Sequence, residues 1–416
     1  MVYIMSPFSE LIAIDSKLVL KPQISADPWF YTNCSINPYR GCQFDCSYCD
    51  GKANYYNIPD FGSVIRSKNN FPKLLEKELL KLGYERQSGK KQMSLNSYLG
   101  SSFNKNQTNS QPKKFLLSVG GGVTDCYQPS EKKLKVMRKI IKVLIDFQIP
   151  SFFLTKSTLI ERDLDLIGEL HDQCYASVNF SCAFRDGPDK SIHEPFSPSI
   201  KKRFEVLEKF TSSRVVGGVL VMPLLPFISD NDETIEYLLR KAKEYKASYA
   251  LTSGLTLKPG NREFFLDKIK NHYPNLLEKY KQIFPENNTF GIPKFTKDLV
   301  NVTAKAHVIS RKYDIYPRIH RYIPDGCNKT NYTLSEHLWY IHYLRKWVLG
   351  DYSYILDKDF KNITNALESL SYSITINELD DLLEKLTIEI QYFNDICVEY
   401  LQTGESKERK RLEATV

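Results

Sequence analysis

Short apolar runs alternate with amphipathic stretches through the middle of the chain, and this alternation most limits the fold that the sequence can adopt. The runs are typical of buried strands, and the stretches between them carry apolar residues at helical spacing. The predicted strands are Phe115–Val119, Ser151–Thr155, Tyr175–Ser181, Val215–Met222 and Ala250–Leu257. The predicted helices between them are Ser130–Phe147, Leu164–Leu170, Ser199–Phe210 and Thr234–Tyr245. Apolar strands separated by helices indicate an α/β protein whose parallel sheet is covered on both faces.

A sixth strand is predicted at Trp29–Ile36, and it leads directly into a loop with three cysteines. Cys42, Cys46 and Cys49 are spaced C-x3-C-x2-C within eight residues. Thiolates this close on one loop can each bind a different iron of a compact iron–sulfur cluster. Four cysteines normally fill a [4Fe–4S] cluster, so three would leave one iron open to a ligand that is not protein.

Two other uses of these cysteines have to be weighed. Zinc prefers four ligands, and the loop has no neighbouring histidine; Cys34 could be a fourth ligand, but it lies eight residues before Cys42 on the predicted strand. A disulfide framework would need a secretory context, and Met1 to Asp15 has neither a basic start nor a sustained apolar run. The spacing therefore favours iron–sulfur over zinc, and zinc over a disulfide.

The cysteine loop resembles that of the radical S-adenosylmethionine (radical SAM) superfamily, whose pattern C-x3-C-x-aromatic-C has Tyr48 in the aromatic position. Pro38–Cys42 together with Tyr48 is more narrowly similar to the spore photoproduct lyase-like, or DNA repair photolyase-like, branch. Phe44 departs from that branch, in which many members have histidine here. The resemblance implies a partial (β/α)6 TIM-like barrel with a C-terminal helical extension. It also implies a [4Fe–4S] cluster on the three cysteines and S-adenosylmethionine as cofactor, with Tyr48 beside it.

A glycine-rich stretch follows the strand Phe115–Val119. Glycines at a strand end let the backbone come close to a ligand, and the resemblance assigns contact with the amino group of S-adenosylmethionine to Gly120 and Gly121. Thr124–Glu131 then matches the T-D-x-Y-Q-P-x-E signature of the branch. Because this match is longer than three glycines alone, it is the more specific signal.

Polar residues after the next two strands extend the resemblance. Lys156 follows Ser151–Thr155, and an ammonium held there can bind the methionyl carboxylate as a point charge. The resemblance assigns that role to Lys156 and a cofactor contact to Ser177; the alternative for Lys156 is a side chain that extends to solvent at the barrel rim. Two further segments are similar to the branch: Arg162–Asp165, where Asp163 is predicted to cap a helix, and Glu194–Arg203.

Cys126 is the one thiol at the top edge of a predicted barrel strand. The lyase uses a cysteine near this strand end to return a hydrogen atom to its product, so the resemblance makes Cys126 a candidate hydrogen donor. Cys126, however, follows Asp125 instead of preceding an acidic residue, and direct alignment puts Gly122 in that position. A small buried cysteine that fills space is the slightly favoured interpretation.

Charge and composition bound the partners and divide the chain. A net charge of +8 over 416 residues tolerates a polyanionic partner without requiring one. Three regions are predicted: an N-terminal lead-in over 1–26, the barrel over 27–260, and a helical C-terminal region over 261–416. Within the barrel, residues 85–114 are predicted to be a mobile basic insertion, either a clamp on phosphates or, as favoured, a solvated loop. No apolar run is long enough for a membrane helix, so a cytoplasmic protein is expected.

The resemblance implies reductive cleavage of S-adenosylmethionine to a 5′-deoxyadenosyl radical, with an external flavodoxin- or ferredoxin-like electron donor. The first hypothesis is a lyase-like enzyme that acts on a nucleic-acid base or a lesion in one. A radical enzyme that modifies tRNA, a peptide or a metabolite would keep the same cofactor residues. A hypothesis from another class is a non-catalytic iron–sulfur or zinc protein that senses redox state. Lys156 and Ser177 discriminate, because a sensor needs no cofactor pocket.

Overall fold

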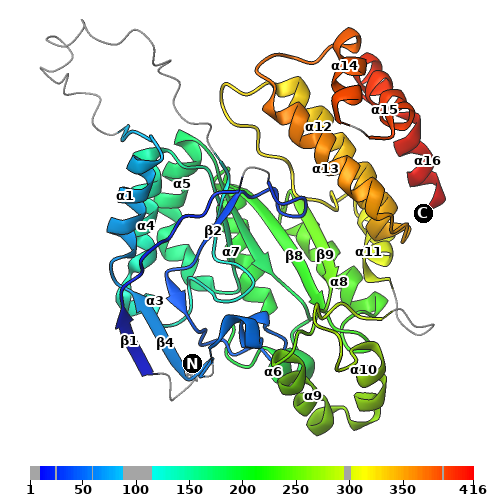
Figure 1. Cartoon of the computed structure of the whole chain (residues 1–416). Helices are drawn as coiled ribbons and strands as arrows, with labels where there is room; N and C mark the ends of the chain where they lie inside the picture. Colours follow the sequence, from blue (N-terminus) through cyan, green and yellow to red (C-terminus); the bar gives the residue numbers. More distant parts are fainter. Residues whose placement is uncertain (1–9, 24–25, 59, 88–114, 295–300, 387) are drawn as a thin grey trace, which may run out of the picture.

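Six parallel strands form the central sheet of the protein, in the order β2-β5-β6-β7-β8-β9. The computed structural model describes residues 10–23, 26–58, 60–87, 115–294, 301–386 and 388–416 (Figure 1). The strands are β2 Cys34–Ile36, β5 Leu117–Val119, β6 Ser151–Thr155, β7 Ala176–Ser181, β8 Val216–Leu224 and β9 Tyr249–Gly254. Helices follow them as α3 Glu131–Leu134, α4 Val136–Phe147, α5 Leu164–Gln173, α6 Pro188–His193, α7 Ile200–Ser212 and α8 Asp232–Glu244. The predicted partial (β/α)6 barrel with a helical C-terminal extension is confirmed.

The outer face of the sheet packs on the helices that connect the strands. Val178 and Val219 point to this face, and they share one core with Met137 and Ile141 of α4. These residues are fully buried because α4 presents an apolar stripe to strands whose side chains alternate between the two faces. The outer layer therefore follows directly from the sequence pattern.

The inner face of the sheet is divided along the strands. Near the strand starts, Phe152 and Tyr249 share a core with Leu334 and Leu338 of α12, which spans Lys329–Tyr343. The chain beyond the barrel also extends the sheet edge, since the Ala250 N–H donates to the Tyr316 carbonyl at 2.9 Å. The C-terminal helices thus cover the inner face of the sheet near the strand starts and leave the strand ends open.

A second sheet and eight more of the described helices complete the fold. A second sheet, in the order β1-β4-β3, is formed by β1 Glu10–Ile14, β4 Val64–Lys68 and β3 Tyr39–Arg40. Beside it lies α1 Phe71–Lys81, and the later helices are α9 Asn261–His272, α10 Leu277–Ile283, α11 Val302–Lys312, α13 Tyr354–Ser369, α14 Ile376–Leu386, α15 Ile390–Thr403 and α16 Lys407–Thr415. Among the described helices, none is both long and apolar enough to cross a membrane. Most of the predicted basic insertion, 88–114, lies outside the described residues.

The strand predicted at Trp29–Ile36 is shorter than expected. Only Cys34–Ile36 pairs with β5, while Trp29 and Phe30 lie in a turn. Their backbone N–H groups donate to Asp27 Oδ1 at 2.9 and 2.7 Å, so a local side-chain contact replaces strand pairing. The two aromatic residues are therefore held above the sheet instead of within it.

Arg318 ties the C-terminal region to this turn. Its side chain is buried, and Nη2 donates to the Pro28 carbonyl at 2.7 Å and to the Tyr31 hydroxyl at 2.9 Å. The guanidinium lies 5.4 Å from the centre of the Trp29 ring and 5.3 Å from that of Tyr343. Stacking on ring faces keeps a buried cation favourable where water is absent.

Replacing Arg318 by methionine should destabilise the protein by about 2–3 kcal/mol, because it leaves a buried carbonyl and a buried hydroxyl without their donor. The measurement is the midpoint of chemical unfolding. Arg240→Met is the matched control, since Arg240 makes an exposed ion pair with Glu244 on α8 and its loss should cost no more than about 0.5 kcal/mol. Equal midpoints for the two variants would contradict this role of Arg318.

Candidate active site

The three cysteines of the predicted cluster line one cavity at the carboxyl ends of the strands. This cavity has a volume of about 390 Å³, and Lys156 and Gly121 are among the residues that line it with the thiols. In α/β barrels, groups at this edge of the sheet carry the chemistry. The structure therefore brings together residues that are more than a hundred positions apart in the sequence.

The cysteine loop is a compact series of turns. The Asp45 N–H donates to the Cys42 carbonyl and the Cys49 N–H donates to the Cys46 carbonyl, each at 3.3 Å. Gly41 precedes the first cysteine with a φ of +84°, and a Cβ at this position would lie 2.6 Å from the Val64 carbonyl oxygen. Only glycine fits this close approach of two backbone segments, which accounts for the glycine of the motif.

The three thiols can be compared with the donor set that a zinc ion requires. Zinc takes four ligands, whereas the loop supplies three thiols to the cavity. In the described part of the chain, no group of three His, Cys, Asp or Glu side chains is arranged to hold a single metal ion, and the described cysteines are free thiols. Cys34, the possible fourth zinc ligand, lies apart; the Lys21 N–H donates to its sulfur at 3.4 Å, and Cys34 lines a different cavity. Burial raises the pKa of Cys46 to about 12, so a bound metal would be needed to keep this thiol ionised.

The signature Thr124–Glu131 holds the cysteine loop in place. The Thr124 hydroxyl donates to the Gly41 carbonyl at 2.7 Å, and Gln128 Nε2 donates to the same oxygen at 3.2 Å. Gln128 Oε1 in turn accepts the Gln43 N–H at 2.9 Å. Because these groups are buried, each contact satisfies backbone that water cannot reach. The signature is thus a clamp on the loop.

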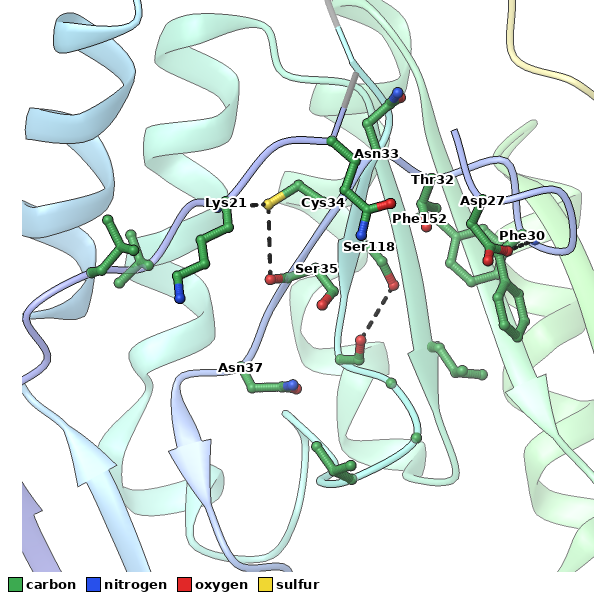
Figure 2. Close-up of a pocket in the computed structure, with 18 of the residues that line it drawn as sticks. Lys21, Asp27, Phe30, Thr32, Asn33, Cys34, Ser35, Asn37, Ser118 and Phe152 are labelled. Atoms are coloured by element: carbon green, nitrogen blue, oxygen red, sulfur yellow. Dashed lines mark hydrogen bonds between the residues drawn. The ribbon is translucent and has the colours of Figure 1, made fainter. Parts of the chain in front are cut away.

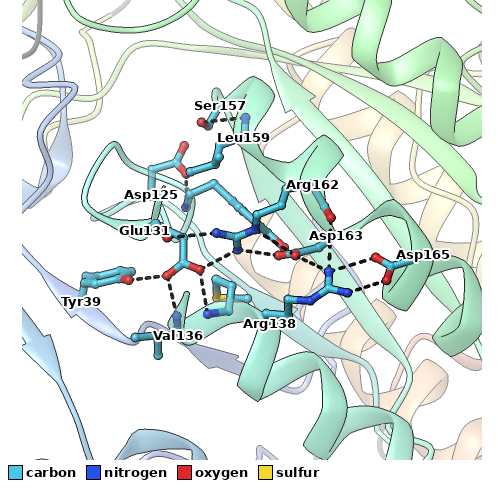
Figure 3. A network of polar contacts seen from close by, with 12 residues as sticks. Tyr39, Asp125, Glu131, Val136, Arg138, Ser157, Leu159, Arg162, Asp163 and Asp165 are labelled. Carbon is cyan, nitrogen blue, oxygen red and sulfur yellow. Dashed lines mark hydrogen bonds and ion pairs between the residues drawn. The ribbon is translucent and has the colours of Figure 1, made fainter. Parts of the chain in front are cut away.

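Glu131 anchors the base of this clamp through charge (Figure 3). The carboxylate is fully buried; it accepts the Tyr39 hydroxyl, and it accepts Arg162 Nη2 at 2.7 Å and the Val136 N–H at 3.0 Å. Tyr39 belongs to the motif before the first cysteine, so the network joins the loop to the start of α4. A buried carboxylate of this kind is stable only when its lone pairs are satisfied.

Asp163 belongs to the same network and does not cap a helix through its side chain. It occupies the predicted N-cap position of α5, but its carboxylate accepts Arg162 at 2.7 Å and Arg138 at 3.0 Å instead. Arg138 also pairs with Asp165, as Figure 3 shows. The predicted cap is therefore wrong, because two guanidinium groups compete successfully for the carboxylate.

Lys156 is held at the cavity by the neighbouring Asp125. The Lys156 N–H donates to Asp125 Oδ2 at 2.8 Å, and the Thr155 hydroxyl donates to Oδ1 at 2.7 Å. Lys156 Nζ lies 5.6 Å from the centre of the Tyr48 ring. Burial acts to lower the pKa of Lys156, but Cys46 and Glu194 outweigh it and raise that pKa above its ordinary value. Lys156 is therefore a half-buried cation that lines the cavity.

The ion pair between Glu194 and Arg203 supports the wall of the cavity around Tyr48. Both residues belong to the segment Glu194–Arg203 that is similar to the branch. Both side chains are fully buried, and the Tyr48 hydroxyl donates to Glu194. Burial acts to raise the pKa of Glu194, but the charges of Arg203 and Lys156 hold it at about 2. Arg203 Nη1 also donates to the Ser181 carbonyl at 2.6 Å. One ion pair thus positions both Tyr48 and the end of β7.

The glycines after β5 differ in their positions. Gly120 has a φ of +86°, and a Cβ there would lie 2.6 Å from the Leu154 carbonyl oxygen, so it permits close strand packing. Gly121 and Gly122 line the cavity with open space above them. Of the two glycines predicted to contact a cofactor, Gly121 therefore lies at this cavity. Gly120 lines only a second, adjoining cavity.

Two predicted residues lie away from the cavity. Ser177 is at the start of β7, where its hydroxyl accepts Asn179 Nδ2 at 3.3 Å. Ser181, four residues later on the same face, lines the cavity instead. Cys126 is buried in the outer core, with its sulfur 3.9 Å from Asn37 Oδ1. The positions of Ser177 and Cys126 give no support to the roles predicted for them. The alternation of polar residues along β7 was the sequence signal that could have identified Ser181.

The chain is similar to several known proteins, although no protein-family model matches it. An uncharacterized protein of Mycobacterium tuberculosis is 26% identical over 268 residues, which cover 63% of this chain and 69% of that protein. An uncharacterized protein of Methanocaldococcus jannaschii is 27% identical over 277 residues, which cover 66% of this chain and 86% of that one.

A similar solved structure is that of spore photoproduct lyase complexed with dinucleoside spore photoproduct. It aligns with a TM-score of 0.48 at 16% identity and covers 73% of this chain and 78% of the lyase.

Replacing Gln128 by alanine should loosen the cysteine loop, because it leaves the buried Gln43 N–H without an acceptor at a cost of about 1–3 kcal/mol. We expect less iron per chain after anaerobic reconstitution and a lower thermal midpoint. Gln173→Ala is the control, since the Gln173 amide bonds an exposed glutamate on α5. Wild-type iron content in Gln128→Ala would show that the clamp is dispensable.

Proposed function

We propose that this protein is a radical SAM enzyme that binds a [4Fe–4S] cluster through Cys42, Cys46 and Cys49 and acts on a nucleic-acid base or a lesion in one. The observation that carries the proposal is the cavity in which three thiols and the half-buried Lys156 meet. Three thiolates leave one coordination position of such a cluster for a small molecule. When bound, the cluster supplies the electron that cleaves S-adenosylmethionine reductively to a 5′-deoxyadenosyl radical.

The side chains around the thiols suit the methionine part of that cofactor. Lys156 provides a half-buried positive charge for a carboxylate, and Asp125 fixes its backbone. Backbone groups at Gly121 are open to the cavity and can meet an amino group. Ser181 offers a hydroxyl at the end of β7, the position that we now assign in place of Ser177. Orientation and exclusion of water are the contributions of the protein.

The sensing alternative accounts less well for this cavity. A redox-sensing cluster needs thiolates and access to an electron partner, but it has no use for an ammonium at the cavity. Lys156 is half-buried there, and the fully buried ion pair of Glu194 and Arg203 lies beside it. Charged groups placed in this way are typical of a site that binds a charged ligand.

A nucleic-acid substrate is supported by the sequence motifs of the branch and by the positive net charge. Trp29 and Phe30 add aromatic rings at the cavity, and bases stack on such rings. An external one-electron donor of the flavodoxin or ferredoxin type completes the proposed reaction.

Protein reconstituted without oxygen should release 5′-deoxyadenosine when it is given dithionite and S-adenosylmethionine, as measured by chromatography. Cys46→Ala should lose both the cluster absorbance and this release. Cys174→Ala is the control, because Cys174 lies at the end of α5 outside the cavity. A wild-type preparation that has an intact cluster but releases no 5′-deoxyadenosine would eliminate the enzyme proposal.

Replacing Lys156 by methionine should weaken binding of S-adenosylmethionine by about 10- to 100-fold, which corresponds to about 1.4–2.8 kcal/mol for a lost charged contact. Cluster absorbance should remain, since Lys156 is not a thiol ligand. Equilibrium dialysis of the oxidised holoprotein measures the affinity. The control is Lys139→Met on the exposed face of α4, and an affinity in Lys156→Met equal to that control would remove Lys156 from the site.

A further inference from the structure

A second cavity adjoins the first on the inner face of the sheet. It has a volume of about 640 Å³ and lies over β2, β5 and β6 (Figure 2). Phe30, Gly121, Gly122 and Leu154 line both cavities. The two spaces therefore meet at the glycine-rich end of β5, and a group bound in one lies beside a group bound in the other.

The sizes of the two cavities indicate which ligand each of them can hold. Sites for a single small ligand usually measure roughly 300–1,000 Å³. The first cavity, at about 390 Å³, is at the lower end of that range and already has to receive the proposed cofactor. A substrate must then bind outside it but within reach, and the second cavity is the adjoining space of sufficient size.

The lining of the second cavity mixes polar and apolar side chains and is almost uncharged. Amide and hydroxyl groups come from β2, its two flanking loops and β5, namely Thr32, Asn33, Ser35, Asn37 and Ser118. Lys21 and Asp27 are its charged residues, and the Asp27 carboxylate is already bonded to the backbone of the Trp29–Phe30 turn. A ligand with several charges would find few partners here, whereas a neutral ligand rich in donors and acceptors would find many.

Aromatic rings form one side of this space. Phe30 and Phe152 both line the cavity, with ring centres 6.1 Å apart and planes inclined at 57°. Figure 2 shows Phe30 and Asp27 on one side of the drawn residues and Lys21 and Asn37 on the opposite side. A planar ring could stack on Phe30 while polar groups of the lining bond its edge, which is how proteins recognise unstacked bases.

We propose that the second cavity binds an unpaired nucleobase of a nucleic-acid strand and presents it to the cofactor cavity. This inference rests on the proposed function, because it supplies the substrate position for that chemistry. Among the described strands, β2 lies at the edge of the six-stranded sheet, so the cavity borders that edge. The exposed Lys21 lies at its rim, where it can contact a phosphate of the strand that remains outside.

The test uses reconstituted, oxidised holoprotein with S-adenosylmethionine and a fluorescein-labelled single-stranded DNA oligonucleotide, before and after ultraviolet irradiation. Ser35→Trp should fill the cavity, since Ser35 lies on the edge strand, and Asn33→Ala should remove one amide. Fluorescence anisotropy should show wild-type binding and a loss of at least ~10-fold in each variant, the size expected for one stacked or bonded base. Ser212→Trp, on the exposed end of α7, is the matched control and should bind as the wild type does.

Iron content and thermal midpoints establish that both cavity variants are folded. Wild-type affinity in folded Ser35→Trp and Asn33→Ala would overturn the assignment of this cavity. Failure of the wild type to bind either form of the oligonucleotide would overturn the assignment of its ligand as a base. Both results differ from failure of the proposed chemistry, which is scored separately as the absence of 5′-deoxyadenosine from wild-type protein.

Discussion

The position of the cysteine loop depends on buried polar contacts more than on apolar packing. The loop has to expose three thiols to a cavity, so it cannot fold around them as a hydrophobic core would. Gln128 and Glu131 clamp it from the β5 side, while Ser47 bonds His193 from the α6 side through Nδ1 at 2.6 Å. Because each of these groups is shielded from water, removing one partner would leave the other without its hydrogen bond. The loop therefore has one well-defined geometry. Most of the signature Thr124–Glu131 thus positions the loop instead of taking part in chemistry.

The charged groups around the cavity likewise depend on a small number of partners. Lys156 and Arg203 bring two positive charges close to the cavity, and Glu194 provides one compensating negative charge. The remaining positive charge faces the thiols, which suits a site that receives thiolate-bound metal and a carboxylate. Tyr48 joins the two sides, since its ring lies near Lys156 and its hydroxyl bonds Glu194. The aromatic position of the cysteine motif is therefore part of the electrostatic framework.

Local patterns predicted the sheet and the outer helices from periodicity, and the three-cysteine loop from spacing, whereas Lys156 was assigned through the resemblance to a family. Long-range contacts decided what could not be predicted. Ser177 and Ser181 lie on the same face of β7, but only the packing around β7 shows which one reaches the cavity. Trp29 and Phe30 alternate as a strand would, yet Asp27 turns them away from the sheet. Within the C-terminal region, which was predicted only to be helical, α14 and α15 pack against each other.

The C-terminal region gives the barrel its interior shape. Its helices pack on the inner face near the strand starts, whereas the cavity lined by the three cysteines lies at the strand ends. Through Arg318 the same region holds the turn that places Trp29 and Phe30 at this cavity. A partial barrel has an open side by construction, and an isolated one would leave these rings without support. The helices that follow the barrel are therefore as much a part of the site as the strands, because they set its depth and fix its aromatic wall.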